Sequence, residues 1–133
     1  MVVRIVRLGS PRAENEGLRI GTVRRPPRGV PRAEFAVRNW YDTWLPNLAP
    51  SVETMKLGQA AQAPAQWDAF ARKYRAEMAT PDHVHLIGLL AALSQTTDFS
   101  VGCYCEDESH CHRSVLRDLL VAAGARLAPA SSG

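Results

Sequence analysis

The sequence predicts an α/β fold, a three-layer sandwich built around a mainly parallel, Rossmann-like sheet. Short apolar runs of strand length alternate with longer stretches whose apolar residues recur at helical spacing. The last such unit, residues 98–125, reads as strand, polar loop and helix, and its apolar strand is of the kind that is covered on both faces. A chain of 133 residues is long enough to bury one core. We therefore expect a single compact domain over residues 1–126, followed by a flexible tail at residues 127–133.

The N-terminal third contains two candidate strands. Residues 2–8 alternate apolar and basic side chains, and residues 18–23 form a second run of strand length after a turn-rich loop. Residues 24–32 then combine four arginines with three prolines, so regular structure is excluded there. If the strands are parallel, this basic loop leaves the sheet at the same edge as the polar loop near the C-terminus.

The aromatic centre of the chain has a mixed period. Phe35 and Val37 fit a strand, whereas Trp40, Trp44 and Leu48 fit one face of a helix. Two prolines that follow shortly afterwards exclude a long helix. We therefore expect short elements in this segment, with at least one of the tryptophans packed in the core.

Three helices are expected between the aromatic segment and the last strand. Ser51 is a suitable N-cap for a short helix, and residues 63–79 form the clearest helix of the chain. Thr80 is a suitable N-cap for a further helix over residues 82–94, because proline follows it at the first helical position. The apolar stripe of the clearest helix predicts core packing and consists of Trp67, Phe70, Ala71, Tyr74 and Met78.

Charge is unevenly distributed along the chain. Residues 1–38 carry nine arginines and three glutamates, a balance of +6, whereas residues 39–133 have a balance of −3. Arginine binds phosphate and carboxylate groups through a rigid fork, so one interpretation is a small anionic ligand or nucleic acid as the partner. GC-rich coding, with most of these arginines simply solvated, explains the same excess equally well.

Composition also limits the class of protein. No apolar run approaches the roughly 20 residues of a membrane span, and the N-terminal apolar segment is too short for a signal peptide. Three cysteines clustered beside histidines favour reduced thiols and a cytoplasmic setting over a disulfide framework. Neither the Gly-x-Gly-x-x-Gly nor the Walker-type nucleotide pattern is present.

The cysteines, which all lie at the end of the last strand and in the loop after it, suggest a metal site. Cys103 and Cys105 lie two residues apart, so their side chains share one face of a strand. Cys111 with His112, or with His110, would complete a tetrahedral set of ligands for zinc. The spacing matches none of the familiar zinc motifs, so other interpretations stay open.

A reactive thiol is the second interpretation of the same loop. Cys111 stands at the expected helix start, where backbone N–H groups and the helix dipole lower the pKa of a thiol. His112 would act as general acid or base, and Arg113 would add positive charge. Cys111 and Arg117 also satisfy the His-Cys-x5-Arg spacing of cysteine phosphatases, but the glycines that wrap a phosphate are missing.

Two further interpretations need no reaction. Arg113 and Ser114 at the helix N-terminus, together with Arg28, would hold a phosphate or a nucleic-acid backbone. Buried free cysteines also behave as small hydrophobic residues, and Cys103 fits that structural role best.

Several segments together resemble the YeaO-like family of domain-of-unknown-function proteins (DUF 488). Cys103 and the later Cys111-His112-Arg113 are similar to the family's Cys-x-Glu and Cys-His-Arg elements, with Cys105 at the usual glutamate position. Three other segments, Pro27-Arg28-Gly29, Trp44 to Ser51 and Phe70 to Tyr74, are similar to its Trp-Pro-Arg-Gly, Trp-Leu-x-x-Leu-Ala-Pro-Ser and Phe-x-x-x-Tyr segments. The resemblance covers about residues 1–122. It implies a compact α/β fold and suggests an enzyme, but it supplies no reaction.

Together these patterns predict an enzyme that acts on an anionic substrate, either phosphorylated or a nucleic acid. The predicted catalytic residues are Cys111, His112 and Arg113, and the predicted substrate-binding residues are Arg28, Trp44, Asn47, Ser114 and Arg117. The alternative is a module without catalysis, either nucleic-acid-binding or stabilised by zinc on Cys103, Cys105, Cys111 and His112.

Overall fold

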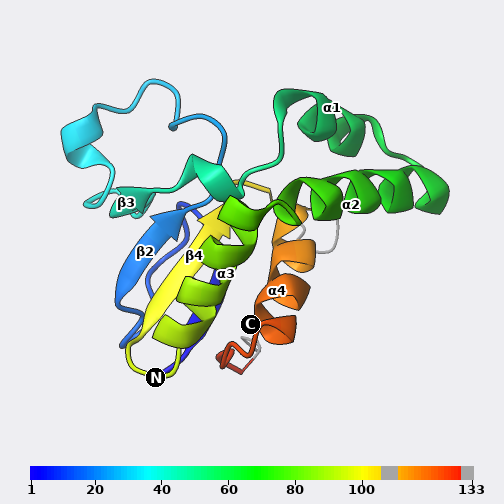
Figure 1. Ribbon diagram of the computed structural model, residues 1–133. Coiled ribbons are helices and arrows are strands. Elements are labelled where there is room, and N and C mark those ends of the chain that lie inside the picture. Colours follow the sequence, from blue (N-terminus) through cyan, green and yellow to red (C-terminus); the bar gives the residue numbers. More distant parts are fainter. Residues whose placement is uncertain (106–110, 130–133) are drawn as a thin grey trace.

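A computed structural model describes residues 1–105 and 111–129 of the chain. Within these residues the chain forms a four-stranded, all-parallel sheet with helices packed on it (Figure 1). The strands are β1 (Val3–Arg7), β2 (Leu18–Gly21), β3 (Thr43–Trp44) and β4 (Phe99–Cys103). The helices are α1 (Val52–Ala60), α2 (Pro64–Met78), α3 (Pro81–Leu93) and α4 (His112–Ala122), with short 3-10 turns at Arg32–Glu34 (η1) and Pro46–Leu48 (η2). The predicted α/β fold with a parallel sheet is confirmed.

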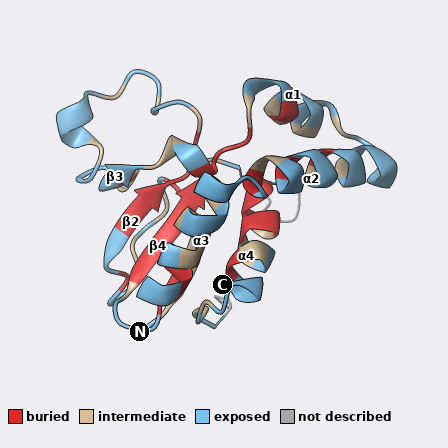
Figure 2. Ribbon diagram, in the orientation of Figure 1, coloured by how far each residue is buried: buried red, intermediate tan, exposed pale blue. Residues whose placement is uncertain are grey.

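The last strand in the sequence lies in the middle of the sheet. The strand order is β1-β4-β2-β3, so Phe99 pairs with Val3 on one side and with Leu18 on the other. All five residues of β4 are buried, which explains its continuous apolar run (Figure 2). Because all the strands are parallel, the loops that follow β2 and β4 leave the sheet at the same edge.

Helices pack on one face of the sheet. The core there joins Val3 and Val101 of the sheet to Tyr74 of α2 and to Leu116 and Leu120 of α4, and all five side chains are fully buried. The apolar stripe predicted for residues 63–79 accordingly lies in the core over much of its length. The α1 and α2 pair lies beyond the carboxyl ends of the strands, where it overhangs the sheet edge (Figure 1).

Irregular segments cover the other face, so the third layer consists of loops rather than helices. Arg19 of β2 points into this layer, where it pairs with Glu16 at 2.7 Å and donates to the carbonyls of Ser10 and Asn39. A Cβ added to Gly21 would lie 2.4 Å from the ring of Tyr41. That close approach leaves no space for a side chain on β2 at this position.

The helix starts follow the predictions with one difference. Ser51 caps α1 as expected, because its hydroxyl accepts the N–H of Thr54. The same hydroxyl donates to Glu77 of α2, which ties the two helices together. Thr80 lies at the N-cap of α3, but its hydroxyl contacts His83 instead of capping a backbone N–H.

Two segments differ from the expected pattern. The second strand ends at Gly21 rather than at residue 23, and Phe35 and Val37 lie in turns rather than in a strand. At the C-terminal end, Leu127 forms a β-bridge with Val3. Leu127 belongs to the predicted tail, of which residues 130–133 lie outside the described part.

Candidate thiol and histidine site

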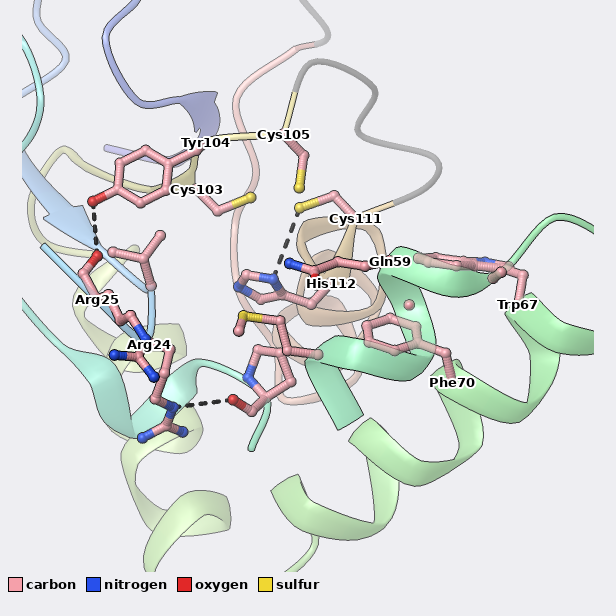
Figure 3. A pocket seen from close by; sticks show the side chains of 15 residues that line it. Arg24, Arg25, Gln59, Trp67, Phe70, Cys103, Tyr104, Cys105, Cys111 and His112 are labelled. Atoms are coloured by element: carbon pink, nitrogen blue, oxygen red, sulfur yellow. Dashed lines mark hydrogen bonds between the residues drawn. The ribbon is translucent and has the colours of Figure 1, made fainter. Parts of the chain in front are cut away.

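Three ionisable side chains meet where β4 ends and α4 begins. Cys103 is the last residue of β4, Cys111 is the N-cap of α4 and His112 is its first residue. One atom from each of the three, two Sγ atoms and a ring nitrogen, lie within 4.8 Å of one another, and all three residues are buried. Figure 3 shows the Sγ of Cys105 beside that of Cys111. We call these four residues the cysteine cluster.

The orientation of His112 is set by the backbone immediately after β2. Its Nε2 lies 2.8 Å from the carbonyl oxygen of Thr22. A carbonyl only accepts, so Nε2 carries the hydrogen and Nδ1 keeps its lone pair. Nδ1 lies 3.8 Å from the Sγ of Cys111 and faces the cluster (Figure 3). Burial lowers the pKa of His112 to about 4, which keeps the ring neutral near pH 7.

The three thiols differ in exposure. Cys103 and Cys111 are each 2% exposed, whereas Cys105 is exposed. Hydrogen bonds from the thiols of Cys103 and Cys111 lower the pKa of Cys105, and the nearby His112 and Arg113 act in the same direction. The same hydrogen bonds, together with burial, raise the pKa of Cys103. A negative charge in the cluster therefore resides on Cys105, the sulfur that a ligand can reach.

Arg113 binds the backbone of Cys105 and does not line the cavity. Its guanidinium is buried and donates to the backbone carbonyl of Cys105 at 2.6 Å. Its Nε is buried without a hydrogen-bond partner in the described part of the chain. The guanidinium thus holds the backbone of Cys105 in place above the start of α4.

The cluster forms the floor of a cavity of about 500 Å³. This volume lies within the range of small-molecule sites, which are mostly apolar with few polar groups. Gln59 of α1 and the arginines of the loop after β2 supply its polar groups besides the cluster (Figure 3). The apolar wall consists of Val23, Pro50, Met55, Gly58, Ala61, Trp67 and Phe70.

The basic loop after β2 reaches the cavity, as parallel strands predict. Arg24 and Arg25 both line it. The guanidinium of Arg24 donates to the carbonyls of Ala49 and Pro50, both at 3.1 Å, which fastens this loop to the start of α1. The hydroxyl of Tyr104 donates to the carbonyl of Arg25 at 2.9 Å, which fastens the loop to the end of β4 (Figure 3).

The predicted substrate-binding residues do not converge on this cavity. Arg28 lines a neighbouring cavity, and Arg117 lines another along β1. Trp44 is exposed and donates from its indole N–H to the carbonyl of Val23, and Asn47 lies in η2. The hydroxyl of Ser114 donates to the carbonyl of Cys111.

The structure thus brings together Cys103, Cys111 and His112 of the predicted zinc set, and Cys105 lines the same cavity. The five predicted substrate-binding residues do not line this cavity, although Ser114 bonds the backbone of Cys111. His110, the other predicted ligand, lies outside the described residues.

Sequence reasoning missed the apolar wall of the cavity. The helical spacing of Trp67 and Phe70 predicts core positions, and their rings do stack, with centroids 4.7 Å apart. Both also line the cavity, as do Met55 and Gln59 of α1. An amphipathic pattern shows which face of a helix is covered, but it does not show that an open cavity covers part of that face.

The chain belongs to the DUF488-N3a family, described as the active DUF488-N3 subclade, which matches residues 3–124. This match confirms the resemblance to the DUF 488 proteins. Comparison with curated proteins and with solved structures gives no match. Within the described residues, none of the helices combines the length and apolar character that a membrane span requires.

Proposed function

We propose that this protein is an enzyme that transfers a group to or through a thiol, with Cys105 as the reacting residue. One observation carries the proposal: an exposed cysteine lies beside two buried thiols and a neutral histidine, on the floor of a cavity large enough for a small molecule. The family description, "active", agrees with an enzyme but names no reaction.

Cys105 replaces Cys111 as the proposed nucleophile. The helix start favours Cys111 from the sequence, but its Sγ is buried and lies against the ring of His112. Cys105 is exposed and receives hydrogen bonds from the two buried thiols. A thiolate that is hydrogen-bonded on one side and open on the other is the form in which cysteine reacts.

The proposed first step forms a bond between the Sγ of Cys105 and an electrophilic carbon of the substrate. The bond from that carbon to its leaving group breaks, and the leaving group departs with the electron pair. The Cys111 thiol, hydrogen-bonded to Cys105, gives its proton to the leaving group and becomes a thiolate. In the second step, water or another thiol attacks the same carbon and loses its proton to the free Nδ1 of His112. The bond from this carbon to the Sγ of Cys105 breaks, so Cys105 departs as a thiolate, and His112 passes the proton from Nδ1 to Cys111 and restores its thiol.

The walls of the cavity indicate the substrate class. Aromatic and aliphatic side chains form most of the lining, so the substrate has an apolar or planar body. Arg25 and Gln59 at the polar side of the cavity suit a carboxylate, phosphate or amide on that body. The anionic substrate predicted from the sequence is therefore narrowed to a small molecule with an apolar or planar body and a carboxylate, phosphate or amide group.

Site-resolved alkylation of the full-length protein tests the proposal. We expect iodoacetamide at pH 6 to label Cys105 at least tenfold faster than a free model thiol, with Cys103 unlabelled, as read by peptide mass spectrometry. Cys105→Ser is expected to abolish the fast phase, and Arg72→Ala, an exposed change on α2, to leave it intact. A Cys105 rate no faster than that of the model thiol would overturn the proposal. Faster labelling of Cys111 would return the nucleophile to the helix start.

A metal centre is the second candidate, because the three buried ligand atoms lie within 4.8 Å of one another. The donor set fits zinc: two or three thiolates with one imidazole match known structural sites, and the Nε2 hydrogen bond to Thr22 is the support that ligating histidines usually have. Cys103, Cys111 and His112 would hold the ion, with Cys105 as the fourth ligand.

Elemental analysis of protein purified without chelators separates the two candidates. Stoichiometric zinc that is lost in His112→Ala would establish the metal centre, and the free thiols would then be slow to alkylate. Metal below one-tenth of an equivalent, together with fast labelling of Cys105, would leave the thiol enzyme as the function.

A further inference from the structure

A second cavity lies beside the thiol site and is separated from it by one side chain. Tyr104, the residue after β4, lines both cavities. The second cavity has a volume of about 640 Å³ and is lined by Arg28, Trp40 and Pro27, with Arg7 at the end of β1. We call it the Trp40–Tyr104 groove. None of the chemistry proposed for the cysteine cluster uses it.

The groove combines two half-buried aromatic rings with arginine. The rings of Trp40 and Tyr104 meet edge to face, with centroids 5.8 Å apart and an interplanar angle of 76°. Gly9, which also lines the groove, packs closely against Trp40, because an added Cβ would lie 2.9 Å from the indole. Aromatic rings that are closely packed and still half-exposed are suited to stacking on a planar ligand.

The charges of Arg25 and Arg28 are not neutralised within the described part of the chain. Residues 1–38 have a balance of +6, and one of their three glutamates, Glu16, is paired with Arg19 on the sheet. Arg25 and Arg28 are both exposed, and no described residue forms an ion pair or a hydrogen bond with either guanidinium.

We propose that the Trp40–Tyr104 groove binds single-stranded nucleic acid, with one base stacked on the ring of Tyr104 and adjacent phosphates on Arg28 and Arg25. Stacking platforms beside arginine are the usual means of binding single strands without reading their sequence. Arginine on both sides of Tyr104, one lining each cavity, favours a continuous backbone over a single nucleotide. This inference shares Arg25 with the proposed substrate site but uses none of the reacting groups of the cysteine cluster.

Fluorescence anisotropy with a labelled 12-nucleotide oligothymidylate tests the proposal on the full-length protein. We expect binding at 50 mM salt that weakens steeply as salt is raised. The double variant R25A/R28A should flatten the slope of log Kd against log salt by about 0.7 for each phosphate that the variant no longer binds. Arg72→Ala is the control for a positive charge removed away from the groove, and it should leave that slope unchanged, because Arg72 is exposed on α2 and lines neither cavity.

Variants at Tyr104 and two altered probes test the stacking. Tyr104→Leu should weaken binding on the order of tenfold, whereas Tyr104→Phe, which keeps the ring, should bind within about twofold of the wild type. An abasic oligonucleotide of the same length should bind as weakly as the Leu variant binds the normal strand.

Four results would overturn the proposal. These are no binding at 50 mM salt, equal losses in R25A/R28A and Arg72→Ala, equal affinity for the abasic strand, and thymidine monophosphate binding as tightly as the oligonucleotide. The last result would make the groove a site for a free nucleotide.

Discussion

Within the described residues, two buried clusters of polar and ionisable side chains are built differently. Beneath the sheet, Glu16 accepts hydrogen bonds from Arg19, from Ser100 and from the backbone N–H of Ala13. Each of these hydrogen-bond partners of Glu16 is a group of the protein itself. At the carboxyl edge of the sheet, the cysteine cluster opens into a cavity, and Nδ1 of His112 keeps a lone pair that faces sulfur.

The difference separates a structural polar cluster from a functional one. Burying a charge is costly unless it is paired and hydrogen-bonded, and the Glu16–Arg19 pair meets that condition completely. The cysteine cluster leaves acceptor and donor capacity facing a cavity, which adds no stability but leaves room for a ligand. We therefore expect changes in the first cluster to affect folding, and changes in the second to affect reactivity.

The largest expected effect is on stability, from breaking the closed cluster. Glu16→Ala leaves Arg19 charged and fully buried, so the free energy of unfolding should fall by about 3–5 kcal/mol. Urea denaturation followed by circular dichroism measures this change. Glu14→Ala, an exposed glutamate in the same loop, is the control and should stay within about 0.5 kcal/mol of the wild type. A loss below about 1 kcal/mol for Glu16→Ala would contradict the structural role.

The next effect is a dependence of stability on pH. Burial alone would raise the pKa of Glu16, but the hydrogen bonds from Arg19, Ala13 and Ser100 lower it from an ordinary value of 4.5 to about 2. A lowered pKa in the folded state stabilises the protein above pH 4.5, and this contribution is lost as the pH falls from 4.5 towards 2. At about 1.4 kcal/mol for each pKa unit, the loss is roughly 3 kcal/mol.

Urea titrations at intervals between pH 2 and pH 6 measure this loss. The pKa values of Asp42 and Glu77 are also lowered by their hydrogen bonds, against the opposing effect of burial, so they add to the slope in the same direction. Glu16→Gln removes the titrating group, and its stability should vary less over this range. An equal slope in the variant would show that Glu16 does not titrate as the structure implies.

Part of this contrast was predictable from the sequence. Cys103, Cys111 and His112 come together because the end of a parallel strand and the start of the next helix are neighbours, a rule of local order that needs no tertiary knowledge. Ser51 as an N-cap and the stripe through Phe70 and Tyr74 follow from equally local signals.

The rest depends on contacts that no local pattern records. The insertion of β4 between β1 and β2 brings Ser100 to Glu16, and a loop glutamate three residues before a strand arginine gives no sign of burial in the sequence. Arg113 is predicted to face a ligand because it lies at a helix N-terminus beside Cys111. The carbonyl of Cys105 offers it a buried partner instead, and only the tertiary structure could show that.

A smaller effect on stability separates the cysteines from one another. Cys103→Ser places a hydroxyl at a position that is 2% exposed, which should cost about 1–2 kcal/mol. Cys105→Ser lies at an exposed position and should change stability by less than about 0.5 kcal/mol, while it removes the reactive thiol. Urea denaturation and alkylation of the two variants, measured side by side, test whether Cys103 is structural and Cys105 reactive. A Cys105→Ser variant as unstable as Cys103→Ser would make the whole cluster structural.

The smallest effect concerns the helix that forms one wall of the cavity. Ser51→Ala removes the hydroxyl that caps α1 and donates to Glu77, so stability should fall by about 1 kcal/mol. Because this cap lies at the start of α1, hydrogen exchange should accelerate in residues 52–60 more than in residues 64–78. Thr80→Ala is the matched control, since Thr80 is an N-cap whose hydroxyl bonds no backbone N–H, and its effect should be smaller. Equal exchange rates in α1 and α2 of the Ser51 variant would mean that the cavity wall and the core unfold as one unit. The open site would then be no less stable locally than the closed core.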